Sequence, residues 1–199
     1  LYDIVYFSSL IVTPCYLGLG AVSEEFITLA FGEKYAASAI YLTLSTAAIS
    51  GAIMAWYLPN LLISGGFTAA ALKLKVVGFV RTLAVSGVTV WFGVEVMLAS
   101  LTITTYLLLP VSFSITSKYF SISLVKMLKV NLPSIVSSIV MVTTIYLAKL
   151  FLVKDLELLS RLVSLVCLGV VVYSLTLVLF FRRDVLKVLQ IAKSLRKNS

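Results

Sequence analysis

Six long apolar stretches constrain this chain more than any other feature of its sequence. About 20 apolar residues in a helix cross a bilayer, and each backbone amide in hydrocarbon must be bonded within its own segment. The stretches do not alternate in polarity as the strands of a membrane barrel do. We therefore predict an all-α, polytopic transmembrane helical bundle of about six spans. The expected spans are residues 4–22, 36–63, 76–94, 96–116, 132–153 and 162–181.

Composition agrees with a bilayer as the solvent. Of the 199 residues, 61% are hydrophobic and 12% are charged, whereas soluble domains contain about 45–50% apolar and about 25% charged residues. A soluble fold of this size lacks the interior to bury so much apolar surface. We assign residues 1–181 to the bundle and residues 182–199 to a basic cytoplasmic tail. Because the chain opens at Leu1, we expect it to be a piece of a longer chain.

The distribution of Lys and Arg predicts the orientation. With the C-terminal tail in the cytoplasm and six alternating spans, 12 of the 16 basic residues lie inside, opposed by Asp3 and Asp184. This arrangement follows the positive-inside rule. Basic and apolar residues are mixed along the tail, so we expect an amphipathic helix on the inner leaflet surface. Residues 118–130 have the same character and are also expected at the interface.

Proline and glycine predict where helices are interrupted. Pro59, followed by Gly65 and Gly66, predicts a kink or break and then a turn. Gly93 predicts a tight hairpin between the third and fourth spans. Pro133 is expected at the start of the fifth span, where its missing amide hydrogen does no harm.

Enzyme chemistry is not expected. The sequence has no His, and its two Cys residues, Cys15 and Cys167, each lie within an apolar run, so neither a disulfide nor a zinc site is predicted. There is no Ser/His/Asp set, no paired-carboxylate motif in a span and no phosphate-binding glycine loop. No cofactor or metal is expected. Nucleic acid is not an expected partner either, because the chain has no solvated basic face.

Arg81 is the first candidate for a binding residue, because it lies inside the third span near the predicted cytoplasmic side. Charged residues within spans are functional candidates, and a guanidinium offers a planar fork to a phosphate or pyrophosphate. The alternative is a side chain that extends to lipid headgroups. Lys75 is a second candidate, although it could simply determine topology. Tyr57 and Asn60 surround the predicted break and could line a hydrophilic cavity.

Charged residues near the predicted outer side suggest simpler roles. Glu24 and Glu25 are expected to begin a short interfacial helix, because acids are favourable at a helix N-terminus. Lys149 is expected to extend to the outer interface. No intramembrane acid is predicted, so an ion-coupling site would lie elsewhere.

The order of these features resembles a known transporter family. Residues 17–22 end a span and lead into Glu25, then a Leu-x-Phe-Gly sequence at residues 29–32 and the basic–aromatic pair of Lys34 and Tyr35. A polar break near Asn60, a basic stretch and hairpin after Lys73, and residues 182–184 (Arg-Arg-Asp) follow. This layout resembles the C-terminal half of the polysaccharide (O-antigen) flippases of the multidrug/oligosaccharidyl-lipid/polysaccharide exporter superfamily.

The resemblance implies the second lobe of a two-lobed transporter, without its N-terminal lobe. The implied activity is translocation of polyprenyl-pyrophosphate-linked oligosaccharide for cell-surface polysaccharide biosynthesis, by alternating access in a bacterial inner membrane. Lipid-linked oligosaccharide, membrane lipids and a polysaccharide polymerase or glycosyltransferases would be the partners. Two alternatives remain open, namely a multidrug exporter of the same superfamily and a non-transporting scaffold of a polysaccharide assembly complex.

Overall fold

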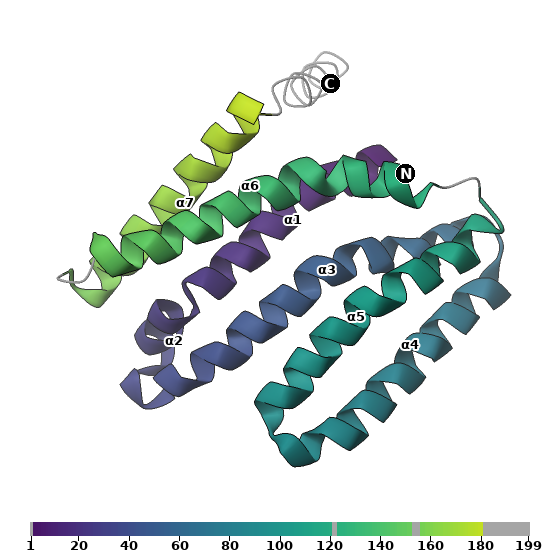
Figure 1. Ribbon diagram of the computed structural model, residues 1–199, viewed down its shortest axis with the longest axis horizontal. Helices are drawn as coiled ribbons and strands as arrows, with labels where there is room; N and C mark the ends of the chain where they lie inside the picture. Colours follow the sequence, from purple (N-terminus) through teal and green to yellow (C-terminus); the bar gives the residue numbers. More distant parts are fainter. Residues whose placement is uncertain (1, 121–122, 153–155, 181–199) are drawn as a thin grey trace.

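The computed structural model describes residues 2–120, 123–152 and 156–180, which form an all-helical fold without strands (Figure 1). The all-α prediction is confirmed for this part of the chain. The elements in chain order are α1 (Tyr2–Ala21), α2 (Ser23–Phe31), η1 (Glu33–Ser38), α3 (Ala39–Ser64), α4 (Thr68–Thr89), η2 (Val90–Phe92), α5 (Val94–Ser117), α6 (Leu124–Phe151) and α7 (Leu158–Phe180).

Several of these helices have the length and composition of membrane spans. Four described segments qualify: Thr68–Phe92, Val94–Ser117, Val125–Phe151 and Leu158–Phe180. The bent pair of α1 and α2 would make a fifth if it is counted as one span. These helices indicate a membrane-embedded protein. The predicted total of six, in which α1 and α3 each cross the membrane, stays a prediction.

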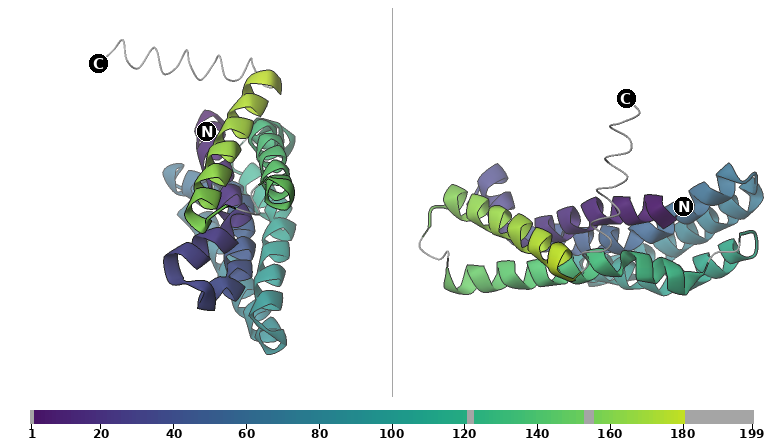
Figure 2. Two further views of the ribbon diagram at one scale, coloured as in Figure 1. Left: turned by 90° about the vertical axis from the view of Figure 1, so that its left-hand side faces the viewer. Right: turned by 90° about the horizontal axis from the view of Figure 1, so that it is seen from above.

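The long helices form two groups that meet along α1 and α3. Helices α3, α4 and α5 contact one another, while α6 packs between α1 and α7, and α2 contacts α7. Figure 2 shows the helices running back and forth along the length of the molecule. A cluster of Val5, Leu58, Phe113 and Met127 joins α1, α3, α5 and α6 at one end. Most other large apolar side chains are exposed, as expected for helices that face lipid.

The helix connections gather at two opposite ends of the bundle (Figure 1). At one end, the backbone N–H of Ser123 donates to the hydroxyl of Tyr2 at 3.1 Å. There the ring of Phe67 lies 4.8 Å from that of Tyr119 and 5.6 Å from that of Phe120. Helix α2, η1, η2 and the start of α7 lie at the other end. This alternation agrees with the predicted order of connections, whereas the side of the membrane that each end occupies stays a prediction.

The structure corrects two expectations about proline. Helix α3 does not break at Pro59 but continues to Ser64, and the predicted turn follows at Gly65 and Gly66, where Gly66 has a positive φ of 83°. Pro133 lies inside α6, which begins at Leu124 after the side chain of Ser123 accepts a bond from the Lys126 N–H. Neighbouring groups within a bundle can compensate for the missing proline donor, so proline does not end these helices.

The start of α6 also changes the interpretation of residues 118–130. The part from Leu124 onward forms the first turns of α6 instead of a separate interfacial segment. The hairpin at Gly93 is confirmed, since α4 passes through η2 into α5 with Gly93 at a φ of 102°. The short helix at Glu24 is confirmed as α2, bent by 70° from α1. The predicted amphipathic tail, residues 182–199, lies outside the described residues.

Candidate functional site

A cavity of about 420 Å³ between α3, α4 and α5 brings together three of the four predicted site residues. Arg81 and Lys75 line it from α4, and Asn60 lines it from α3. The adjacent α5 contributes Thr105 and Ser112. Two cations and several hydroxyl or amide groups therefore share one space within a group of apolar helices.

The helical repeat of α4 explains how Arg81 reaches this cavity. Leu74, Gly78 and Arg81 occupy positions i, i+4 and i+7, which lie on one face of a helix. All three line the cavity. A Cβ atom built on Gly78 would meet nothing within 4 Å, so the space one turn before Arg81 is open. The face of α4 toward α3 and α5 thus combines a cation with room beside it.

Arg81 has hydroxyl partners, and the described lining of the cavity contains no carboxylate. Its Nη1 donates to Thr105 Oγ1 at 2.8 Å, and its Nη2 donates to Thr82 Oγ1 at 3.3 Å. Its Nε is buried without a hydrogen-bond partner. A guanidinium carries five N–H donors. Its positive charge is therefore not neutralised by the described residues of the cavity, and donor capacity is left for an anion.

The other predicted site residues differ in their relation to Arg81. Lys75 is exposed at the cavity lining. The amide nitrogen of Asn60 donates to the backbone oxygen of Trp56 at 3.0 Å, so this part of its side chain is bound to its own helix. Tyr57 does not line the cavity and packs instead against the cluster that contains Val5. The structure therefore separates Tyr57 from the candidate site.

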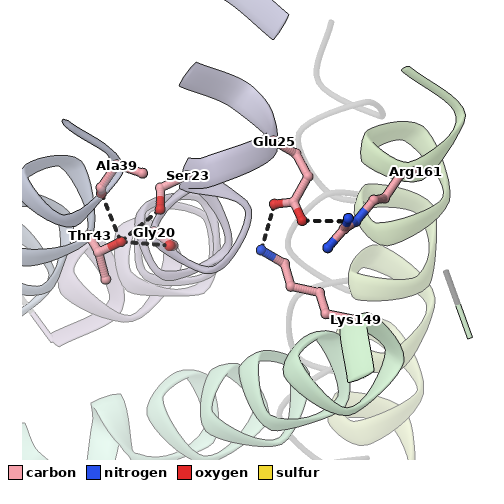
Figure 3. A network of polar contacts seen from close by, with 7 residues as sticks. All are labelled: Gly20, Ser23, Glu25, Ala39, Thr43, Lys149 and Arg161. Carbon is pink, nitrogen blue, oxygen red and sulfur yellow. Dashed lines mark hydrogen bonds and ion pairs between the residues drawn. The ribbon is translucent and has the colours of Figure 1, made fainter. Parts of the chain in front are cut away.

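A second group of charges was not found by sequence reasoning. The carboxylate of Glu25 on α2 lies between Lys149 of α6 and Arg161 of α7 (Figure 3). Lys149 Nζ is 2.5 Å from Oε2, and Arg161 Nε is 3.2 Å from Oε1 without hydrogen-bond alignment. The side chain of Glu25 is 2% exposed. We call these three residues the Glu25 triad.

The Glu25 triad corrects the interpretation of Lys149. Its side chain is 12% exposed and binds Glu25, so it does not simply extend to the outer interface. Glu25 does begin a short helix as predicted, but it is also a buried acid that joins three helices. The partners are far apart in sequence, 124 residues for Glu25 and Lys149. The sequence around Glu25 therefore does not predict that it pairs with Lys149.

Hydrogen bonds at the junction of α1, α2 and α3 hold the start of α2 in place. The hydroxyl of Thr43 lies 2.7 Å from that of Ser23 and 3.1 Å from the backbone oxygens of Gly20 and Ala39 (Figure 3). A Cβ atom on Gly20 would lie 2.4 Å from Thr46 Oγ1, so α1 and α3 approach closely here. This contact lies at the bend between α1 and α2, and Glu25 meets α6 and α7 directly after it.

The two groups of described residues interact through hydrogen bonds at Arg81 and ion pairs at Glu25. The described residues contain no group of three or more His, Cys, Asp or Glu side chains that could hold a metal ion. Comparisons with protein families, curated proteins and solved structures give no match to this chain. The functional argument therefore depends on the cavity at Arg81 and on the Glu25 triad.

Proposed function

We propose that this chain is part of a flippase that moves polyprenyl-pyrophosphate-linked oligosaccharide across a bacterial inner membrane by alternating access. One observation carries the proposal. Arg81 lines a cavity between apolar helices, and the described lining of that cavity holds no carboxylate to neutralise it. A pyrophosphate group supplies the opposite charge and suits the planar donor fork of a guanidinium.

The energetic cost of the arginine supports a ligand role. An arginine near the centre of a membrane helix costs about 2.5–3.5 kcal/mol on insertion scales. The hydroxyls of Thr105 and Thr82 reduce that cost with hydrogen bonds but bring no negative charge. An anionic substrate would add a charge-assisted bond, which is about twice as strong as a neutral one.

The surroundings of the cavity suit a substrate with a polar head and a long apolar tail. Lys75 adds a second cation, and Asn60 and Ser112 add polar groups for sugars. The neighbouring faces of α4 and α5 expose large apolar side chains, such as Phe79, Leu83 and Leu107. The head would occupy the cavity while the tail stays in the bilayer, so little of the apolar chain needs to enter the protein.

The proposal also includes the number of spans, their orientation and the partner. In it, residues 1–181 form one lobe with six spans, including α1 and α3, and the C-terminus is cytoplasmic. The connections that bear Lys73, Lys118 and Lys126 would then face the cytoplasm, as the positive-inside rule favours. A multidrug exporter for cationic compounds would favour acids in the cavity, and its described lining supplies Arg81 and Lys75 instead. A polysaccharide polymerase or glycosyltransferase would be the partner that elongates or supplies the glycan.

A reconstituted transport assay tests the proposal. The full-length protein is placed in liposomes with fluorescent polyprenyl-pyrophosphate oligosaccharide, and movement between leaflets is followed by quenching. Arg81→Gln should slow transport about tenfold or more, because a charged hydrogen bond is lost. Arg81→Lys should retain part of the rate. Lys34→Gln removes one exposed cation far from the cavity and serves as the matched control.

Each outcome separates the alternatives. Equal transport by Arg81→Gln and Lys34→Gln would show that the cavity at Arg81 is not the substrate site. Movement of a cationic dye in place of the lipid-linked glycan would favour a multidrug exporter. Movement of neither compound, with the protein correctly inserted, would favour a scaffold.

A further inference from the structure

A second cavity, of about 400 Å³, lies between α1, α6 and α7. Its lining includes Cys15, Gly18, Ile145, Val166 and Val170 and is almost wholly apolar. Among the described lining residues Tyr173 alone has a hydroxyl, and this group donates to the backbone oxygen of Leu10 at 2.7 Å. The volume is within the range of about 300–1,000 Å³ that is typical of small-ligand sites. The cavity is therefore suited to a hydrocarbon chain.

Small residues and exposed valines line this space. A Cβ on Gly169 would lie 3.1 Å from Ile145 Cδ1, so α7 passes close to α6 there. Val166 and Val170, one and two turns along α7 from Leu162, are 46% and 61% exposed. The α7 side of the cavity is therefore partly open to the surroundings of the helices.

The Glu25 triad lies just beyond one end of this cavity, although none of its three residues lines it. Each triad residue is close in sequence to a lining residue: Phe26 follows Glu25, Leu162 follows Arg161, and Ile145 lies one turn before Lys149. Two cations face one carboxylate, which leaves a net charge of +1. Glu157 precedes Arg161 by one turn, but its side chain is exposed and forms no ion pair in the described part of the chain.

Arg161 is the group through which this excess charge is accessible. Its side chain is 28% exposed, compared with 2% for Glu25. Its Nε faces Glu25, and the terminal nitrogens of the guanidinium are further donors in the same fork. A phosphate at the mouth of the cavity could accept from these donors without displacing Lys149 from Glu25.

We propose that the cavity and the Glu25 triad together bind one membrane phospholipid with an anionic headgroup. Its acyl chain lies in the apolar space between α1, α6 and α7, and its phosphate faces Arg161 and Lys149. An apolar groove that ends at a net positive charge matches a molecule with a hydrocarbon chain and a negative head. This site is distinct from the cavity at Arg81 and does not depend on the proposed transport function.

Lipid titration of the purified full-length protein tests this site. Phosphatidylglycerol and phosphatidylcholine with identical chains are added in detergent, and retained lipid is counted by native mass spectrometry. Both headgroups carry a phosphate, but the choline cation of phosphatidylcholine offsets its charge beside Arg161. The intact protein should therefore retain phosphatidylglycerol about tenfold more tightly. Arg161→Gln should abolish this preference because the Glu25–Lys149 pair that remains is neutral. Lys34→Gln, which removes an exposed cation elsewhere, should keep it.

A second pair of variants tests the chain-binding part. Val170→Trp fills the cavity from an exposed position and should weaken retention of both lipids about tenfold. Val171→Trp adds the same bulk on α7 at a position that is 53% exposed and does not line the cavity, and it should have no effect. Val166→Trp repeats the test from a second lining position, with helical content measured for every variant. The proposal is overturned if Arg161→Gln behaves like Lys34→Gln, or if both lining variants behave like Val171→Trp.

Discussion

The two charged regions of this protein differ in what their cations contact. In the group of α1, α6 and α7, Lys149 and Arg161 share the buried carboxylate of Glu25. In the group of α3, α4 and α5, Arg81 contacts the hydroxyls of Thr105 and Thr82. Removing one partner from a buried ion pair is strongly destabilising. A cation with neutral partners is instead free to bind an anion, so its partners, more than its position in an apolar helix, indicate its role.

Packing differs between the same two groups. In the 18-residue apolar stretches that make α6 and α7 long enough to span a membrane, 33% and 22% of the stretch is buried. The share is 6% in each of α4 and α5. The Glu25 triad therefore ties together the better-packed helices, and the cavity at Arg81 lies among helices with large exposed apolar faces. This contrast leads us to expect the largest effects on stability from the Glu25 triad, and effects that depend on a soluble anion from the cavity at Arg81.

The largest effect is expected at Glu25. Glu25→Gln leaves Lys149 and Arg161 without a negative partner, and the free energy of unfolding should fall by about 3 kcal/mol. Unfolding in detergent, followed by circular dichroism, measures the change. Glu24→Gln alters the exposed neighbour in the same turn and should stay within about 0.5 kcal/mol. Equal effects of the two variants would contradict a structural role for the triad.

The contact between the two groups should be the next most sensitive point. Gly20→Ala places a Cβ atom 2.4 Å from Thr46 Oγ1, so either the Thr46 hydroxyl must leave its bond to the Thr43 backbone oxygen or α1 and α3 must move apart. We expect a loss of about 1–3 kcal/mol, as for overpacked cores, in the same unfolding measurement. Gly87→Ala is the control because a Cβ there meets nothing within 4 Å. A neutral Gly20→Ala would mean that the two groups are not held together at this point.

A ligand effect is expected at Arg81. Inorganic pyrophosphate at ten times its Kd should raise the free energy of unfolding by about 1.4 kcal/mol if it binds the folded state alone. Most of this shift should disappear in Arg81→Gln and remain in Arg161→Gln. Differential scanning fluorimetry of the three proteins checks the result. A shift that disappears in Arg161→Gln and remains in Arg81→Gln would show that pyrophosphate binds at the Glu25 triad, and it would contradict this prediction.

The smallest effect is expected from Arg81→Gln without ligand. Thr105 and Thr82 also donate to backbone oxygens of their own helices, so their hydroxyls keep partners when the guanidinium is removed. The change also removes a buried Nε that has no hydrogen-bond partner. The free energy of unfolding should therefore change by less than about 1 kcal/mol. A loss as large as that of Glu25→Gln would show that Arg81 supports the fold.

Local sequence signals predicted several features correctly. The glycine at position 93 marks a hairpin because its positive φ is unfavourable for other residues. The acids at Glu24 and Glu25 mark the start of α2. Pro59 does not break α3 and Pro133 does not begin α6, because the effect of a proline on a helix depends on neighbouring groups. Helix α6 begins instead at Ser123, whose side chain accepts a bond from the N–H of Lys126.

Some residues of the candidate sites could likewise be predicted from the sequence, and others could not. Arg81 could be found from sequence, since a charge in a long apolar segment stands out, and the spacing of Leu74, Gly78 and Arg81 puts them on one face. Tyr57, close to Asn60 in sequence, faces another cluster in the fold. The link between Glu25 and its two partners required the bend between α1 and α2, which no local pattern specifies.

The sequence alone determined that the chain is helical and apolar enough for a bilayer, because hydrogen bonding and hydrophobicity act within each segment. Tertiary structure decided which charges meet. Electrostatic pairing depends on distances between atoms that are far apart along the chain, and those distances exist after the helices have packed. This is why Lys149 is part of a buried ion pair while Arg81 faces an open cavity, although both are single cations in apolar helices.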